Sequence, residues 1–273
     1  MKKILISIAL VLGNIFTGLC DSQLNIVPAP NKVVKGEGKW VVKNGLTIVS
    51  TDVKDFSANY LQDKLEDVFD FPVVVSSQRK GDGCITFATD KNIPSEGYKL
   101  EVTEKGITIT SSDKSGQYYG MQTLLQLFPA EIYSEDDLRL KEYPIDVLTI
   151  EDAPRFPYRG FMLDVSRTFF DLDYLRNYID WMSSHKLNRL HLHLTDDNGW
   201  RIEIKKYPEL TRKGAWRGQN ELLLPTYLSG SERYGGYYTQ KEMKELIAYA
   251  QERNVMIIPE FDLPGHARSS TAV

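Results

Sequence analysis

Four charged or titratable residues follow three apolar runs in the second half of this 273-residue sequence. Arg167 follows the first run, Asp196 follows the second, and Asp262 and His266 follow the third. If such runs are neighbouring strands of a parallel sheet, their carboxyl ends meet at one edge, where (β/α)8 barrels build their active sites. The pattern predicts a barrel enzyme, although it does not by itself identify a substrate.

The alternation of side chains along a strand predicts where these residues point. Arg167, Asp196 and Asp262 each share their parity with apolar residues of the same strand, so we expect a packed barrel interior that opens onto a polar site. His191 and His193 have the parity opposite to that of Asp196, so both are expected to point toward the helices as structural residues. The apolar residues of matching parity are Leu163 and Val165 for Arg167, Leu192 and Leu194 for Asp196, and Ile258 for Asp262.

Strands and helices are predicted to alternate from residue 159 onward. One helix should begin after the N-cap Asp171, and another near Thr239, where the Thr-x-x-Glu pattern forms a capping box. Strands joined by helical crossovers are typical of β/α architecture with a parallel sheet. The predicted strands cover 160–165, 190–194 and 255–261.

The preceding stretch, from about 25 to 150, is predicted to be a small α+β domain. Its predicted elements are strands over 45–49 and 84–88, a hairpin over 97–110, and helices over 58–69 and 116–127. We find no paired carboxylates, phosphate loop or nucleophile arrangement in this stretch, which favours a structural role.

The first twenty residues have the pattern of a secretory signal. Lys2 and Lys3 precede an apolar run from Ile4 to Phe16, which is too short for a transmembrane helix. Gly18 and Cys20 permit cleavage after Cys20, whereas a second interpretation makes Cys20 a lipidated N-terminus. We expect an exported protein, periplasmic or extracellular, that contacts a membrane only if Cys20 is lipidated. The predicted order is a signal peptide (1–20), an α+β domain (21–150) and a partial catalytic barrel domain (151–273).

The composition excludes some classes of function. A net charge of −4 gives no reason to expect nucleic acid or an anionic membrane as a partner. Four histidines and two cysteines offer little material for a metal centre or a disulfide framework, and we expect no cofactor. Cleavage after Cys20 would leave Cys84 as the only thiol, so that no intramolecular disulfide could form.

Four motifs follow one another between Tyr158 and His266. They are RGFMLDVSR at 159–167, HLHLTDDNGWR at 191–201, GYYT at 236–239 and PEFDLPGH at 259–266. In this order and at this spacing they resemble the β-N-acetylhexosaminidases of glycoside hydrolase family 20. The preceding α+β stretch is similar to the family's N-terminal domain, in the segments 96–98 and 119–125.

The resemblance implies hydrolysis, with retention, of terminal N-acetylglucosamine or N-acetylgalactosamine from β-linked glycans. The 2-acetamido oxygen of the substrate is the nucleophile in this family. By resemblance, Arg167 binds the C3 and C4 hydroxyls of the sugar, while Asp196, Asp262 and His266 support the general acid. The implied partner is a glycan with a terminal N-acetylhexosamine.

One motif of the family is missing. The catalytic Asp-Glu pair belongs to a His-x-Gly-Gly-Asp-Glu motif on the family's fourth barrel strand, and Gly-Gly-Asp-Glu does not occur in the sequence. The resemblance therefore implies that the general acid and its partner aspartate lie beyond Val273, the last residue. We expect a fragment: an α+β domain followed by the first three β/α units of an incomplete (β/α)8 TIM barrel. Because it lacks the general acid, this chain by itself is expected to be inactive.

Two other functions remain open. His191 and His193 on a barrel strand could bind zinc in a metal-dependent hydrolase. A chain without a general acid could instead be a non-catalytic glycan-binding protein. Each site residue also has a structural alternative, such as a surface ion pair for Arg167, a turn cap for Asp196, turn chemistry for Asp262 and an ordinary histidine at His266.

Overall fold

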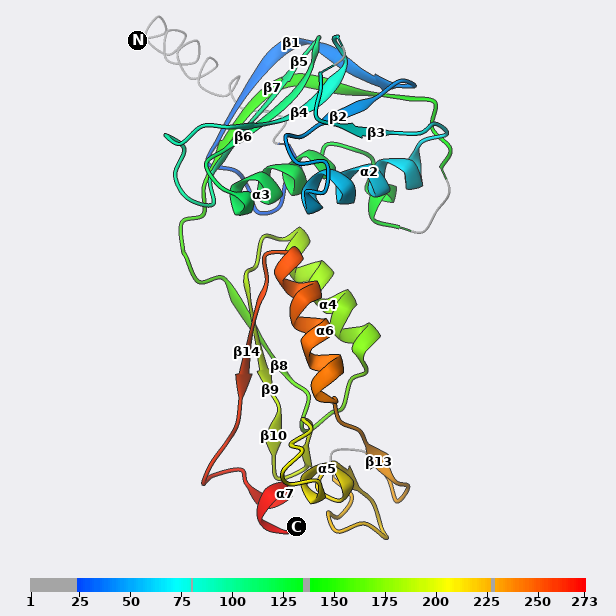
Figure 1. Ribbon diagram of the computed structural model, residues 1–273, viewed down its shortest axis with the longest axis vertical. Coiled ribbons are helices and arrows are strands. Elements are labelled where there is room, and N and C mark those ends of the chain that lie inside the picture. Colours follow the sequence, from blue (N-terminus) through cyan, green and yellow to red (C-terminus); the bar gives the residue numbers. More distant parts are fainter. Residues whose placement is uncertain (1–23, 80, 135–137, 227–228) are drawn as a thin grey trace, which may run out of the picture.

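The computed structural model describes residues 24–79, 81–134, 138–226 and 229–273. These residues form an upper and a lower part, which follow each other along the long axis of the molecule (Figure 1). The upper part ends with strand β7 (Glu142–Asp152), and the lower part begins with β8 (Gly160–Asp164). The predicted signal peptide lies outside the described residues.

The upper part is a seven-stranded sheet with two helices, α2 (Phe56–Val68) and α3 (Lys114–Leu125), on one face (Figure 1). Its strands besides β7 are β1 Lys32–Lys43, β2 Thr47–Val49, β3 Val74–Ser76, β4 Cys84–Thr89, β5 Tyr98–Thr103 and β6 Gly106–Ser111. They pair in the order β1-β7-β5-β6-β4-β2-β3. The pairs β2–β3, β2–β4 and β4–β6 are parallel and the other three are antiparallel.

Local sequence explains why these elements form. The predicted hairpin is confirmed as β5 and β6, with Thr103 opposite Gly106. Gly106 has a φ of +141°, and a Cβ there would lie 2.5 Å from the carbonyl oxygen of Cys84, so both backbone conformation and space require glycine. The predicted helix over 58–69 begins at Phe56, because the carboxylate of Asp55 accepts hydrogen bonds from the first free backbone N–H groups.

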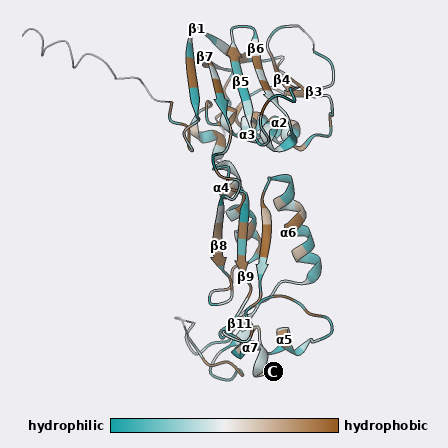
Figure 2. Cartoon of the chain, turned by 90° about the vertical axis from the view of Figure 1, so that its left-hand side faces the viewer, coloured by the Kyte–Doolittle hydropathy of each residue, from teal (hydrophilic) through white to brown (hydrophobic). Residues whose placement is uncertain are grey.

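The lower part contains a three-stranded parallel sheet in the order β14-β9-β8. Its other strands are β9 (Arg189–His193) and β14 (Met256–Glu260), and helices α4 (Leu172–Ser184) and α6 (Gln240–Glu252) lie along one side of it (Figures 1 and 2). The predicted caps are confirmed: the side chain of Asp171 accepts from the backbone at the start of α4, and Thr239 forms the capping box of α6. The predicted strand–helix–strand alternation is therefore present.

A long connection between β9 and α6 folds beneath the carboxyl ends of the strands (Figure 1). It contains two short antiparallel pairs, β10–β11 and β12–β13. Their bounds are β10 Thr195–Asp196, β11 Gly199–Trp200, β12 Trp216–Arg217 and β13 Tyr234–Gly235; the short helices α5 (Glu209–Arg212) and α7 (Arg268–Thr271) lie beside them.

The predicted direction is wrong for four of the five apolar residues, Leu163, Val165, Leu192 and Leu194, whereas Ile258 lies on the site-facing side as predicted. These four side chains pack in one core with residues of α4 and α6, so they face the helices. The opposite face carries Met162, His191 and Ile258, which are register partners on neighbouring strands. Alternation does not continue to the site residues, because β8 ends at Asp164 before a turn and β9 is interrupted after His193. The residues that face the helices are Leu163, Val165, Leu192 and Leu194.

A buried ion pair joins the two parts. The Nζ of Lys186, after α4, donates to Tyr98 Oη at 2.8 Å and to Asp152 Oδ2 at 3.1 Å. Arg159 lies nearby and pairs with Glu96 at 3.1 Å. Since these partners come from β5, β7 and the loop before β5, they fix the amino ends of the lower strands against the upper sheet.

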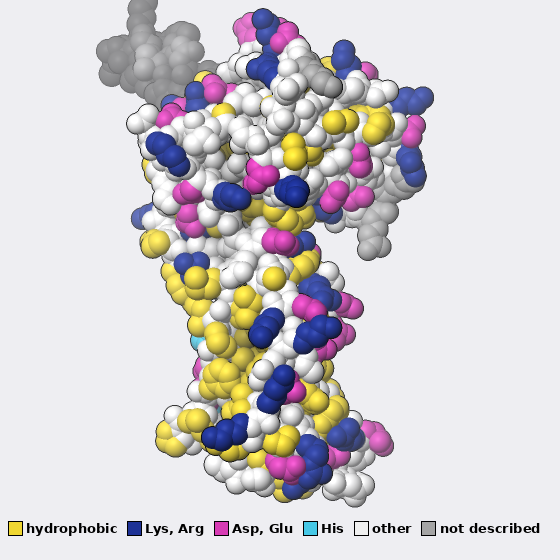
Figure 3. All heavy atoms as spheres, viewed as in Figure 1, with side chains coloured by type: hydrophobic (Ala, Val, Ile, Leu, Met, Phe, Trp, Pro, Cys, Tyr) yellow, Lys and Arg dark blue, Asp and Glu magenta, His cyan; other side chains and the backbone are white. Residues whose placement is uncertain are grey.

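The lower part exposes apolar side chains along the region of β8 and β14 (Figure 3). Phe161, Met162 and Met256 are each about half exposed, and Trp181 is 61% exposed. Within the described residues, none of the helices combines the length and the apolar character needed to cross a membrane.

Candidate functional site

The four residues predicted from the sequence lie together beyond the carboxyl ends of the parallel strands, at the lower end of the molecule in Figure 1. Arg167 lies in the turn after β8, Asp196 ends β10, and Asp262 and His266 follow β14. Arg167 forms an ion pair with Asp196, and His266 Nδ1 lies 3.5 Å from Asp196 Oδ1. A carboxylate oxygen of Asp262 lies within 4.8 Å of ligand atoms of His193 and Asp196.

Arg167 is held by two carboxylates. Its Nη1 donates to Asp164 Oδ2 at 2.5 Å, while its Nη2 pairs with Asp196 Oδ2. Asp164 Oδ1 also accepts from the backbone N–H groups of Ser166 and Arg167, so the same carboxylate fixes the turn and the side chain. The rigid fork of arginine suits two acceptors at once. Sequence reasoning missed Asp164, although it lies within a predicted strand, three positions before Arg167.

Asp196 is the centre of the cluster, with a side chain only 1% exposed. Its Oδ2 accepts from His193 Nε2 at 2.9 Å and pairs with Arg167. Its Oδ1 accepts from the backbone N–H of Asp197 at 2.5 Å and faces His266. Buried carboxylates stay charged only when such partners replace water. His266 Nδ1 lies 3.5 Å from Asp196 Oδ1 and 3.8 Å from Asp197 Oδ2, so Asp196 is the nearer of the two aspartates.

His193 and His191 lie on the site side of the sheet, so their prediction as helix-facing residues is wrong. Besides its bond to Asp196, His193 places Nδ1 3.2 Å from Glu260 Oε1, and His191 Nε2 lies 2.6 Å from Glu260 Oε2. The register explains the grouping, because Asp164, His193 and Glu260 are partners on β8, β9 and β14 and therefore point to the same face.

The carboxylates around His193 change its acid–base behaviour. Burial favours the neutral imidazole, but the bonds to Asp196 and Glu260 outweigh burial and raise the pKa of His193 above its ordinary value. For Glu260, burial favours the protonated acid, but the interactions with His193 outweigh it and lower the pKa of the carboxyl group. Both shifts favour a charged His193–Glu260 pair.

The resemblance implies that the general acid lies beyond Val273. Glu260 lies in the cluster, but its lowered pKa keeps the carboxyl group ionised, which makes it a poor proton donor. Val273 itself is the last described residue, follows the short helix α7 and is 37% exposed. The general acid and its partner aspartate therefore stay predictions for residues beyond Val273.

Two groups of side chains in this cluster have spacing that could hold a metal ion: His193, Asp196 and Asp262, and also Asp196, Asp197 and His266. Within the first group, both ring nitrogens of His193 already face carboxylate oxygens. A metal ion at His193 would therefore have to replace a partner at one of these nitrogens. His191 and His193, the pair proposed for zinc from the sequence, share Glu260 between them.

Two buried arginines support the turn that carries Arg167. Arg201 is fully buried, and its guanidinium donates to the carbonyl oxygens of Val165 and Ser166, and of Ala215 and Gly236 in the long connection. Arg217 donates to the carbonyl oxygen of Arg167 at 2.8 Å. Burial lowers the pKa of Arg201 to about 10, so this residue stays charged at neutral pH. Sequence reasoning did not assign Arg201, although the HLHLTDDNGWR motif ends on it.

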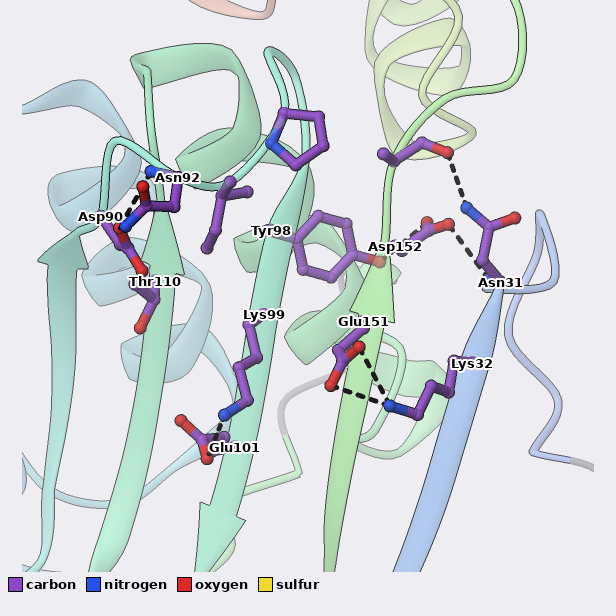
Figure 4. A pocket seen from close by; sticks show the side chains of 13 residues that line it. Asn31, Lys32, Asp90, Asn92, Tyr98, Lys99, Glu101, Thr110, Glu151 and Asp152 are labelled. Atoms are coloured by element: carbon purple, nitrogen blue, oxygen red, sulfur yellow. Dashed lines mark hydrogen bonds and ion pairs between the residues drawn. The ribbon is translucent and has the colours of Figure 1, made fainter.

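A separate cavity of about 550 Å³ lies on the upper sheet (Figure 4). Its charged side chains pair with one another: Lys32 lies 3.1 Å from Glu151, and Lys99 lies 2.8 Å from Glu101. The view shows these pairs along the strands, with Tyr98 above them and next to Asp152. With its charges paired in this way, the cavity lacks the converging arginine, histidine and carboxylates of the lower cluster.

Two family models cover most of the chain. Glycosyl hydrolase family 20, domain 2, matches residues 23–153, and glycosyl hydrolase family 20, catalytic domain, matches residues 156–273. The chain belongs to glycosyl hydrolase family 20. This family 20 chain is 38% identical over 258 residues to a β-hexosaminidase of Porphyromonas gingivalis, and the match covers 92% of the chain and 32% of the relative.

Solved family 20 structures have the same fold. The crystal structure of an exo-β-N-acetylglucosaminidase from Vibrio harveyi in complex with N-acetylglucosamine matches with a TM-score of 0.81 and 36% identity, over 92% of this chain and 38% of that one. A mutant β-hexosaminidase of Streptomyces plicatus in complex with the product GlcNAc matches with a TM-score of 0.78 and 35% identity, over 90% and 47%. The family 20 chain spans roughly a third of the length of the curated relatives it matches.

Proposed function

We propose that this chain belongs to an enzyme that removes terminal N-acetylglucosamine or N-acetylgalactosamine from β-linked glycans. The observation that carries the proposal is the position of Arg167, held between Asp164 and Asp196 at the carboxyl ends of the parallel strands of a family 20 chain. An arginine fixed in this way presents hydrogen-bond donors without a risk of losing its charge. Its side chain is 32% exposed, so a sugar can reach it.

We propose that hydrolysis proceeds with retention and with help from the substrate. The 2-acetamido oxygen attacks the anomeric carbon, the glycosidic bond breaks, and a general acid protonates the leaving oxygen. Water then opens the cyclic intermediate and restores the acetamido group. In this scheme Arg167 holds the C3 and C4 hydroxyls, while Asp196, Asp262 and His266 orient and tune the general acid.

The general acid and its partner aspartate are proposed to come from the family's His-x-Gly-Gly-Asp-Glu motif, beyond Val273 in the full-length protein. That motif does not occur in the 273 residues. We further propose that β8, β9 and β14, with helices α4 and α6, are three units of a (β/α)8 barrel. Their parallel order and the polar cluster at their carboxyl ends support this proposal.

The test is an assay of the full-length protein on aryl β-N-acetylglucosaminide and aryl β-N-acetylgalactosaminide. The matched control substrate is the aryl β-glucoside, which has the same leaving group but no acetamido oxygen. We expect hydrolysis of at least one acetamido sugar with the β-anomer as the first product by NMR, and no comparable hydrolysis of the glucoside. Equal rates on the glucoside would contradict substrate assistance, and stoichiometric zinc in the active protein would favour the metal-dependent alternative.

We also propose that the protein is exported. The support is the sequence of residues 1–20, with two lysines before an apolar run. Mass spectrometry of the mature N-terminus in the producing cell should show cleavage next to Cys20. A diacylglycerol adduct on Cys20 would indicate a lipid anchor, and an uncleaved N-terminus would contradict the proposal.

A further inference from the structure

The geometry points to His193 as a positioning residue of the site, which holds Asp196 in place through a charged bridge to Glu260. This inference rests on the proposed function, because it assigns His193 to the sugar-binding side of the same site. The contacts of His193 itself carry the argument.

The side chain of His193 lies between two carboxylates from different strands. Nε2 bonds to Asp196 Oδ2 at 2.9 Å, and Nδ1 lies 3.2 Å from Glu260 Oε1. Only the protonated imidazolium can donate from both nitrogens. Its side chain is 6% exposed, so little water competes for these positions. The contacts therefore require a charged His193 to satisfy both carboxylates.

The same Asp196 oxygen contacts both His193 and Arg167. A positive charge at His193 thus holds Oδ2 of Asp196 beside His193 and Arg167, while Oδ1 stays with the backbone of Asp197 and faces His266. Without that charge, Glu260 and Asp196 would repel each other across His193. We expect Asp196 to move away from Glu260, and Arg167 to lose its fixed orientation toward the sugar.

Every neighbouring element contributes a charged or titratable group near His193. They are Asp164 from β8, Arg167 from the turn after it, His191 from β9, Asp196 from β10, Glu260 from β14 and Asp262 from the loop that follows β14. The carboxylates raise the pKa of His193. A raised pKa means that the stabilising charge is present at low pH and is lost as the pH rises through the pKa of the folded state.

The experiment measures binding of N-acetylglucosamine by calorimetry in the full-length protein across pH, with hydrolysis of an aryl β-N-acetylglucosaminide alongside. Binding of this product does not require the general acid. In the wild-type protein, affinity should fall as the pH rises through the pKa of His193. His193→Gln should weaken binding and raise KM by about 10- to 150-fold, equivalent to one charged hydrogen bond, and should abolish that pH dependence.

Glu260→Gln keeps His193 and provides a second variant, in case His193→Gln folds poorly. It should move the loss of affinity to lower pH, and NMR titration of the His193 imidazole should show the same shift. His185→Gln, an exposed histidine just after α4, is the matched control and should behave like the wild type.

Failure of the proposed function and failure of the proposed role of His193 would give different results. A wild-type protein that neither binds N-acetylglucosamine nor cleaves the aryl substrate would overturn the proposed function. An active wild type whose His193→Gln variant has unchanged affinity and pH dependence would overturn the role of His193, as would an imidazole pKa at or below that of free histidine.

Discussion

Replacement of Arg167 by lysine tests the site most directly. Arg167 reaches Asp164 through Nη1 and Asp196 through Nη2. A lysine keeps the positive charge, but its ammonium group is a single point that cannot reproduce a planar fork between two carboxylates. Arg167→Lys should therefore preserve net charge while it releases one carboxylate and removes donors that we propose bind the sugar.

The expected loss of kcat/KM in Arg167→Lys follows from the number of hydrogen bonds that the variant removes. A hydrogen bond that involves a charged group contributes about 1.5–3 kcal/mol. One or two such bonds to the sugar would contribute about 1.5–6 kcal/mol in the transition state, and because lysine keeps a charge and some donors, the expected loss is about 2–4 kcal/mol. At about 1.4 kcal/mol per factor of ten, kcat/KM should fall about 30- to 700-fold.

The assay compares kcat/KM of the full-length wild type and Arg167→Lys on an aryl β-N-acetylglucosaminide, with thermal unfolding to confirm that the variant folds. Arg176→Lys is the matched control, because Arg176 pairs with the exposed Asp173 on the surface of α4, outside the site. The control should lose less than about twofold, in line with the small energies of exposed pairs. Wild-type kinetics for a folded Arg167→Lys variant would refute the assignment of Arg167 to the substrate.

Three further predictions concern other parts of the structure. His266→Ala should lower kcat and also shift a limb of the pH–rate profile, whereas a uniform rate loss would indicate a structural role. Lys186→Met should lower the free energy of unfolding in urea by about 3–5 kcal/mol, because it leaves the carboxylate of Asp152 buried without its cation. Adding Asp152→Asn should recover most of this loss. A Lys186→Met variant as stable as the wild type would contradict this prediction. Gly199→Ala would place a Cβ 2.2 Å from the buried guanidinium of Arg201. The variant should therefore lose about 1–3 kcal/mol of stability and some activity. Wild-type stability and wild-type activity in this variant would show that Arg201 can move.

Much of the architecture could be predicted because its signals are local. The β5–β6 hairpin follows from alternation and a glycine at the turn, and helices α4 and α6 follow from the caps Asp171 and Thr239. The proximity of Arg167, Asp196 and His266 could also be predicted, since parallel strands bring their carboxyl ends to one edge. The catalytic roles of these residues stay predictions.

The directions of the side chains at the strand ends were decided by tertiary structure. Periodicity assigns a residue to a face only while the strand stays regular, and here it is interrupted at Leu194 and ends in the turn at Val165. The roles of Asp164 and Glu260 around His193 depend on the register between three strands that are far apart in sequence. Sequence alone therefore determined the elements and the edge at which the site forms, whereas the packing of strand against strand determined which charges meet there.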